Sequence, residues 1–97
     1  MNTANQSHPR IRLDDVESSQ IHSIGHCPET NTLAIRFTKG YGAQRGPGSL
    51  YHYANFSAAE FKAFKAADSL GKHFKNYIRP FPLKFPYHKV AEEQQAA

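Results

Sequence analysis

The sequence has only one cysteine, no tryptophan and no long apolar run. A helix that spans a membrane needs about 18 or more consecutive apolar residues, so we expect no membrane insertion. The single cysteine, Cys27, has no partner for an internal disulfide. The start of the chain also lacks the charged-then-apolar pattern of a secretory signal. Together these absences predict a soluble cytoplasmic protein.

The chain also lacks the spacing of a metal or catalytic site, although it contains six histidines. His22 and His26 would lie about 13 Å apart on an extended strand, which is too far for both to bind one ion. Cys27 lacks the helix-start or glycine-framed surroundings that activate a thiol. We therefore predict no catalytic residue, no metal ligand and no cofactor. The expected activity is binding, not enzymatic catalysis.

Acidic residues are scarce in the second half of the chain, and the formal net charge is +4. Residues 57–90 contain seven Lys or Arg but only two acidic residues, and residues 36–56 contain three basic residues and no acidic one. A basic half favours an anionic partner, either nucleic acid or an acidic protein surface. A solvated, lysine-rich helix surface with no partner is the alternative.

The 97 residues leave room for one small domain between polar ends. We predict a flexible N-terminal tail over residues 1–15, a domain over residues 16–79, and a Pro/aromatic strap with a flexible tail over residues 80–97. Three prolines keep residues 80–89 extended. This segment is either a strap, in which Phe81 and Phe85 pack back on the domain, or an interaction arm.

Three strands are predicted in the first half. Residues 21–27 form a short strand with a bulge at Gly25, and a turn over residues 28–31 leads to a clearly alternating strand over 32–38. Residues 40–49 contain four of the six glycines, so we expect a long flexible loop before the third strand.

Two helices are predicted to follow. Ser57 and Glu60 have the spacing of a capping box, and Phe56 and Phe61 have that of a hydrophobic staple. Ser69 offers a second cap, after which Leu70, Phe74, Tyr77 and Ile78 lie at the spacing of a buried helix face. The expected fold is α+β, with a three-stranded antiparallel sheet followed by two helices packed on one face (β-β-β-α-α).

Candidate binding residues lie on both kinds of element. Lys72, Lys75 and Arg79 fall on the side of the second helix opposite its apolar face and form a basic ridge. Tyr51 and Tyr53 share one face of a strand. Two interpretations of this pair remain open: they stack against unpaired bases, or the helices cover them and their rings are core.

Several short motifs occur in a fixed order along the chain. They are Ser18-Ser19, Ile21-x-x-Ile24-Gly25, Tyr51-x-Tyr53 and Ser69-x-Gly71. In this order, over residues 16–79, the chain resembles the KTSC family, small domains also found at the C-terminus of some lysyl-tRNA synthetases. RNA binding is the usual suggestion for that family, so the resemblance implies an RNA partner.

We therefore predict a small module that binds RNA or another single-stranded nucleic acid. Phosphates are expected to contact Lys72, Lys75 and Arg79, together with Arg36 and Lys39, while bases stack on Tyr51 and Tyr53 if these are exposed. The alternative is a protein-interaction adaptor that docks on an acidic surface of the transcription or translation machinery. It would use the same ridge and the aromatic segment 80–89.

Overall fold

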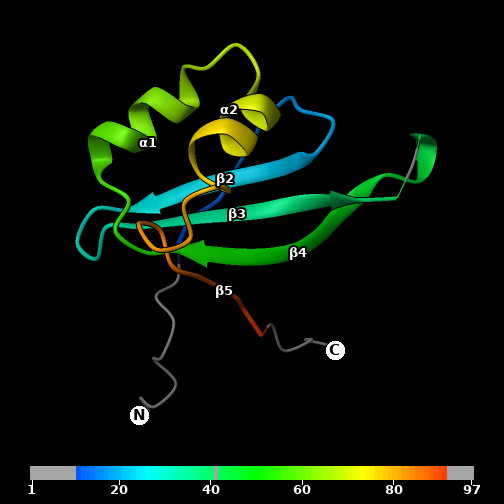
Figure 1. Ribbon diagram of the computed structural model, residues 1–97. Coiled ribbons are helices and arrows are strands. Elements are labelled where there is room, and N and C mark those ends of the chain that lie inside the picture. Colours follow the sequence, from blue (N-terminus) through cyan, green and yellow to red (C-terminus); the bar gives the residue numbers. More distant parts are fainter. Residues whose placement is uncertain (1–10, 41, 92–97) are drawn as a thin grey trace.

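The computed structural model describes residues 11–40 and 42–91 (Figure 1). Five antiparallel strands form one sheet in the order β1-β2-β3-β4-β5, and two helices follow β4 in the chain. The strands are β1 (Asp14–Asp15), β2 (Ile21–Cys27), β3 (Thr32–Lys39), β4 (Gly46–Tyr53) and β5 (Tyr87–Lys89). The helices are α1 (Ala58–Lys65), α2 (Leu70–Tyr77) and the short 3-10 helix η2 (Gly42–Gln44).

The prediction of an α+β fold with two helices is confirmed, but the number of strands was wrong. The sheet has five strands instead of three, because short strands β1 and β5 are added at its two edges. They come from the segments predicted as a tail and as a strap with a tail. Two and three residues are too few to show the alternation that reveals a strand in sequence. Residues 1–10 and 92–97, where the rest of both predicted tails falls, lie outside the described residues.

The three central strands follow the predicted hairpin pattern with two changes. The register shifts between Ile21 and Ser23, not at Gly25, where we expected the bulge. The loop predicted over residues 40–49 is also shorter than expected, because β4 already begins at Gly46, which pairs with Lys39. Glycine disfavours strands on its own, but here a neighbouring strand supplies the hydrogen bonds.

Both helices lie on the same face of the sheet (Figure 1). The capping box of α1 is present: the Glu60 backbone N–H donates to Ser57 Oγ at 3.1 Å, and the Ser57 N–H donates to Glu60 Oε1 at 2.8 Å. Ser69 caps α2 through its Oγ, which accepts from the Lys72 backbone N–H at 3.2 Å. These caps explain why the chain forms two short helices and why each begins where it does.

The hydrophobic core lies between the helices and this face of the sheet. Its largest fully buried side chains are Phe56, Phe64, Ile21, Ile24, Leu33, Ile35 and Ile78. Tyr77 was predicted to belong to the buried face of α2, but it is 61 % exposed. Its ring instead contacts the His73 ring at the surface in a tilted arrangement, with the centroids 4.9 Å apart and the ring planes 45° apart. The apolar face of α2 is therefore a narrow stripe of Leu70, Phe74 and Ile78.

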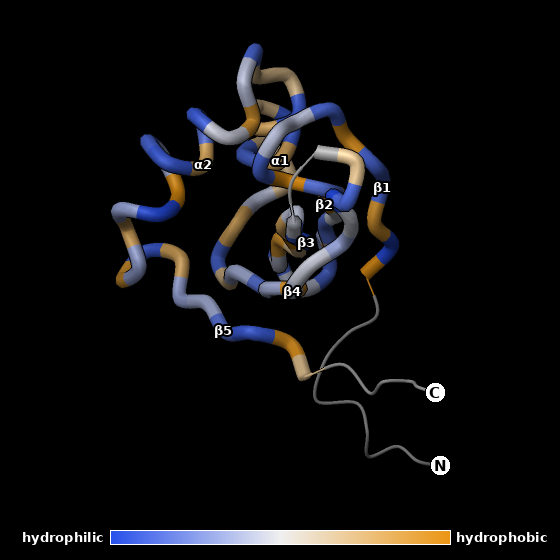
Figure 2. Tube along the Cα trace, turned by 90° about the vertical axis from the view of Figure 1, so that its right-hand side faces the viewer, coloured by the Kyte–Doolittle hydropathy of each residue, from blue (hydrophilic) through white to orange (hydrophobic). Residues whose placement is uncertain are grey.

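The other face of the sheet is covered in part by the N-terminal segment. Gly25, Ala34 and His52 are in register across three strands and are buried. The chain at Arg12 passes so close that a Cβ atom at Gly25 would collide with the Arg12 carbonyl oxygen. Figure 2, turned by 90°, shows β1 and β5 at opposite edges of the strands. Residues 11–15 thus belong to the folded domain, whereas the sequence predicted a tail.

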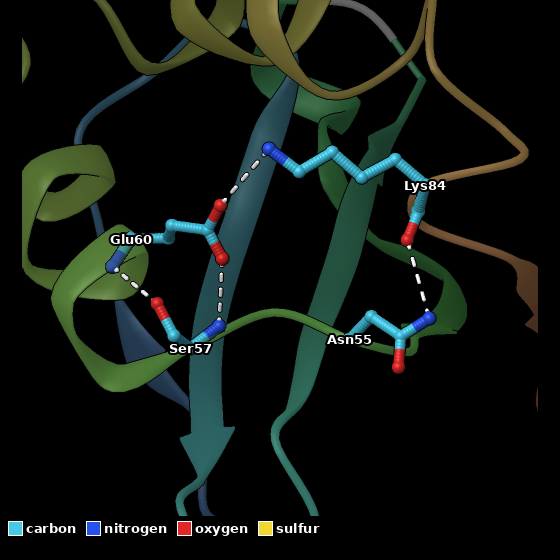
Figure 3. Close-up of polar contacts among 4 residues, drawn as sticks. All are labelled: Asn55, Ser57, Glu60 and Lys84. Atoms are coloured by element: carbon cyan, nitrogen blue, oxygen red, sulfur yellow. Dashed lines mark hydrogen bonds and ion pairs between the residues drawn. The ribbon is translucent and has the colours of Figure 1, made fainter.

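The strap, residues 80–86, connects α2 to β5 and is fixed to the start of α1 (Figure 3). Lys84 Nζ lies 3.4 Å from Glu60 Oε2, and Asn55 Nδ2 donates to the Lys84 carbonyl oxygen at 3.3 Å. Phe85 is buried in the core, as a strap requires, whereas Phe81 is 47 % exposed. The strap interpretation therefore holds for Phe85 but not fully for Phe81.

A candidate ligand-binding cleft

A cleft of about 750 Å³ opens between the end of α2, the strap and strands β3, β4 and β5. This volume lies within the range of small-molecule and cofactor sites in proteins. Six aromatic side chains line it: Phe37, Tyr51, Tyr53, Phe74, Phe85 and Tyr87. Lys39 and Arg79 are its only charged lining residues among those described. We refer to this site as the aromatic cleft.

Most of these rings contact one another and form a continuous wall. Tyr87 stacks on Tyr53 with ring centroids 5.5 Å apart, and Phe74 meets Tyr53 edge-on at 5.7 Å. Tyr51 lies 6.1 Å from Tyr87 and 5.7 Å from Phe37 by the same measure. Strand register explains this grouping, because Tyr51 and Tyr53 point to one face of β4 and Tyr53 pairs directly with Tyr87.

The tyrosine pair predicted as a stacking platform faces the helices. Tyr53 is only 5 % exposed, and Tyr51 is half-buried against the core. The core interpretation is therefore correct for the Tyr53 ring, so the predicted Tyr51–Tyr53 pair does not form an open platform. The exposed aromatic ring is that of Tyr87, which is 56 % exposed. Tyr87 belongs to the segment 80–89, whose role the sequence left open between a strap and an arm, because pairing of this segment with β4 cannot be inferred from local sequence.

The Tyr53 hydroxyl is the polar group at the inner end of this wall. It has no hydrogen-bond partner among the described residues, yet no described side chain leaves a fully buried polar atom unsatisfied. The hydroxyl therefore reaches the open space of the cleft. Burial raises the pKa of Tyr53, with Tyr51 and Tyr87 adding to the rise and the positive charge of Arg79 opposing it. The phenol stays neutral at physiological pH, and Arg79 lies within electrostatic range of it.

The remaining predicted residues divide into three groups. Lys39 and Arg79 line the aromatic cleft, and neither forms an ion pair with another described residue. Lys72 and Lys75 are exposed, as expected, but line a separate hollow beside Ser18–Gln20 that also contains Glu17 and Asp68. Arg36 is partly buried, and its Nη1 donates to the Gly48 carbonyl oxygen at 2.9 Å, so it fastens β3 to β4.

Comparison with known proteins identifies the family of this fold. A family model described as the KTSC domain matches residues 17–81. The chain belongs to the KTSC domain family.

Two relatives agree with this assignment. An uncharacterized protein of Stutzerimonas stutzeri is 32 % identical over 65 residues, which cover 67 % of this chain and 80 % of the relative. The crystal structure of a KTSC domain protein from Yersinia pestis is similar with a TM-score of 0.67 and 29 % identity. That likeness covers 84 % of this chain and all of the Yersinia chain.

The KTSC match ends before the cleft is complete. Tyr51, Tyr53 and Arg79 lie inside the matched segment, whereas Phe85 and Tyr87 lie beyond residue 81. In this KTSC domain the outer wall of the aromatic cleft is thus built by the strap and β5.

The residues considered for chemistry do not gather in one place. His26 stacks on Phe61 with ring centroids 5.1 Å apart, and its Nε2 lies 2.6 Å from the Phe56 carbonyl oxygen, which gives it a packing role. Hydrogen bonding with Thr30 lowers the pKa of Cys27. Within the described part of the chain, no three His, Cys, Asp or Glu side chains are placed to hold a metal ion.

No helix of residues 11–40 and 42–91 is long and apolar enough to cross a membrane.

Proposed function

We propose that this KTSC domain is a non-enzymatic module that binds single-stranded nucleic acid, with RNA as its partner, in the aromatic cleft. One observation carries the proposal: an exposed ring, Tyr87, and a half-buried ring, Tyr51, lie in one cleft with Lys39 and Arg79, two cations that form no ion pair with another described residue. Each base that stacks on an aromatic side chain contributes about 1–3 kcal/mol. Lys39 and Arg79 neutralise backbone phosphates at the same time.

Three further features support a single strand of RNA. A duplex keeps its bases stacked inside, so only an unpaired strand offers them to a narrow aromatic cleft. Lys72 and Lys75 lie on α2, and Arg79 lies in the turn that follows it, so the two lysines extend positive charge away from the cleft, where flanking phosphates would pass. Membership of the KTSC family, for which RNA binding is the usual suggestion, also favours RNA. Such binding would take place in the cytoplasm.

An amide NMR titration of the labelled protein with an oligouridine of about eight nucleotides tests the proposal, at about 20 mM and about 150 mM salt. We expect localised shifts around Lys39, Tyr51, Tyr53, Arg79 and Tyr87 that become smaller at the higher salt. Lys75→Ala should weaken binding at low salt, whereas Lys62→Ala, on the exposed surface of α1, should not. An unchanged spectrum at both salt concentrations overturns the proposal.

A second candidate function, the protein-interaction adaptor, is favoured by a different observation. Three large apolar side chains are exposed within residues 77–83: Tyr77, Phe81 and Leu83, the last at 94 %. Tyr77 and Phe81 line a hollow between α1, α2 and the strap whose surface is mainly apolar. An adaptor would use them, with the nearby basic residues, on an acidic surface of the transcription or translation machinery.

Substitutions distinguish the adaptor better than removal of residues 80–97, because that deletion also takes Phe85 from the core. The adaptor predicts that Leu83→Ser and Phe81→Ser abolish a stoichiometric protein complex and leave affinity for oligouridine unchanged. The opposite result would exclude the exposed apolar surface of residues 77–83 as the docking site. In that result, Tyr51→Ala or Lys39→Ala abolishes the complex, whereas Leu83→Ser and Phe81→Ser still form it.

A further inference from the structure

The geometry points to a phosphate subsite inside the aromatic cleft, in which the Tyr53 hydroxyl and the Arg79 guanidinium together hold one phosphate of the bound strand. This inference rests on the proposed function and assigns a specific role to a residue whose ring belongs to the core. It separates two roles within the cleft: Tyr51 and Tyr87 offer ring surface to bases, while Tyr53 offers its hydroxyl to the backbone.

The first argument is the placement of the Tyr53 side chain. Its ring is almost fully buried; Phe74 meets it edge-on, and Tyr87 stacks against it. Its hydroxyl nevertheless reaches the cleft without a hydrogen-bond partner among the described residues. A hydroxyl in such a position loses most of its hydration and gains from a ligand acceptor. Because packing already fixes the ring, binding of a ligand to the hydroxyl costs little side-chain entropy.

The second argument is the chemistry of the neighbouring groups. The neutral phenol is a hydrogen-bond donor, and Arg79 adds a guanidinium within electrostatic range. No Asp or Glu is among the described residues that line the cleft. A site of donors and positive charge without a carboxylate selects an anionic acceptor, and a guanidinium matches the tetrahedral oxygens of a phosphate in a bidentate geometry.

The other basic hollow is less suited to this role. Lys72 and Lys75 share it with Glu17 and Asp68, whose carboxylates oppose an anion. Two of its hydroxyl groups also act as local caps: Ser18 Oγ accepts from the backbone N–H groups of Gln20 and Ile21, and Ser69 Oγ accepts from that of Lys72. The cleft therefore offers the better anion site of the two.

The test compares two probes on the full chain by NMR titration or fluorescence: a tetranucleotide of deoxythymidine and its analogue with neutral methylphosphonate linkages. We expect the wild-type protein to bind the natural probe more tightly. Tyr53→Phe keeps the ring and removes only the hydroxyl, and it should weaken binding of the natural probe about tenfold. Arg79→Lys keeps the positive charge but loses the bidentate hydrogen-bonding geometry of the guanidinium, so it should also weaken binding of the natural probe. Tyr77→Phe, whose hydroxyl lies outside the cleft, is the matched control and should change nothing.

The neutral probe shows whether the two residues act on the phosphate. In the double variant Tyr53→Phe/Arg79→Ala, the difference in affinity between the two probes should shrink, and Tyr77→Phe should retain it. A wild-type protein that binds neither oligouridine nor the natural probe overturns the proposed function itself. Binding by the wild type with equal affinity in Tyr53→Phe overturns the subsite alone and leaves the function in place. Thermal unfolding of each variant, unchanged from wild type, confirms that the comparison concerns folded protein.

Discussion

Tyr87 stacks on Tyr53 with ring centroids 5.5 Å apart and ring planes 28° apart, so an exposed ring lies directly against a buried one. The two residues pair across β4 and β5. This contact joins the core to the surface of the aromatic cleft. It also makes the short edge strand β5 part of the candidate site, since β5 carries the exposed Tyr87 ring to that position.

We predict that Tyr87→Ala lowers the affinity for oligouridine about tenfold, because it removes one stacking surface worth about 1–3 kcal/mol. Tyr77→Ala is the matched control, since Tyr77 has similar exposure but lies outside the cleft. Fluorescence anisotropy at low salt measures both. Equal losses in the two variants would contradict a role for the cleft.

A second prediction concerns the N-terminal segment. Gly25→Ala should destabilise the fold by about 1–3 kcal/mol, because the new Cβ collides with the Arg12 carbonyl oxygen and forces the segment away from β2. Gly46→Ala is the control, since nothing lies within 4 Å of a Cβ built there. Urea unfolding gives both free energies. A Gly25→Ala protein as stable as Gly46→Ala would show that residues 11–15 do not pack on the sheet.

The parts of the fold that sequence reasoning predicted depend on local signals. Ser57 and Glu60 lie three residues apart and satisfy each other's backbone groups, so the start of α1 was readable from four residues. The edge strands were not readable, because Asp14–Asp15 becomes a strand only through pairing with β2. Tyr77 was wrongly predicted to be buried, because helical spacing does not reveal how far the sheet extends beneath α2.

The candidate site was predicted less completely than the fold. Composition and spacing identified Tyr51, Tyr53, Lys39 and Arg79, which the structure brings into one cleft. The direction of the tyrosine rings depends on which face the helices cover, and this is a tertiary property. The role of Tyr87 depends on the pairing of β5 with β4, which joins distant parts of the sequence.

A third prediction concerns the salt dependence of binding. Lys39→Ala should lower the affinity for oligouridine and reduce the slope of log affinity against log salt by about one, because one phosphate contact is lost. Lys62→Ala removes an equal charge from α1, outside the cleft, and should leave the slope unchanged. Titrations at several salt concentrations measure the slopes. Identical slopes in all three proteins would exclude a phosphate contact at Lys39.

The last prediction concerns acid stability and the attachment of the strap. The Ser57 backbone N–H, aided by the nearby Lys84, lowers the pKa of Glu60 below its usual value of 4.5. A carboxyl whose pKa is lower in the folded state stabilises the fold at neutral pH, and this contribution is lost as the pH falls below about 4.5. Glu60→Gln keeps a side chain that can cap α1 but removes the charge, so it should lose less stability than wild type between pH 7 and about pH 3. Glu29→Gln, in the exposed β2–β3 turn, should behave like wild type in the same urea titrations. If Glu60→Gln also follows the wild-type pH dependence, the Glu60 charge does not stabilise the junction of α1 and the strap.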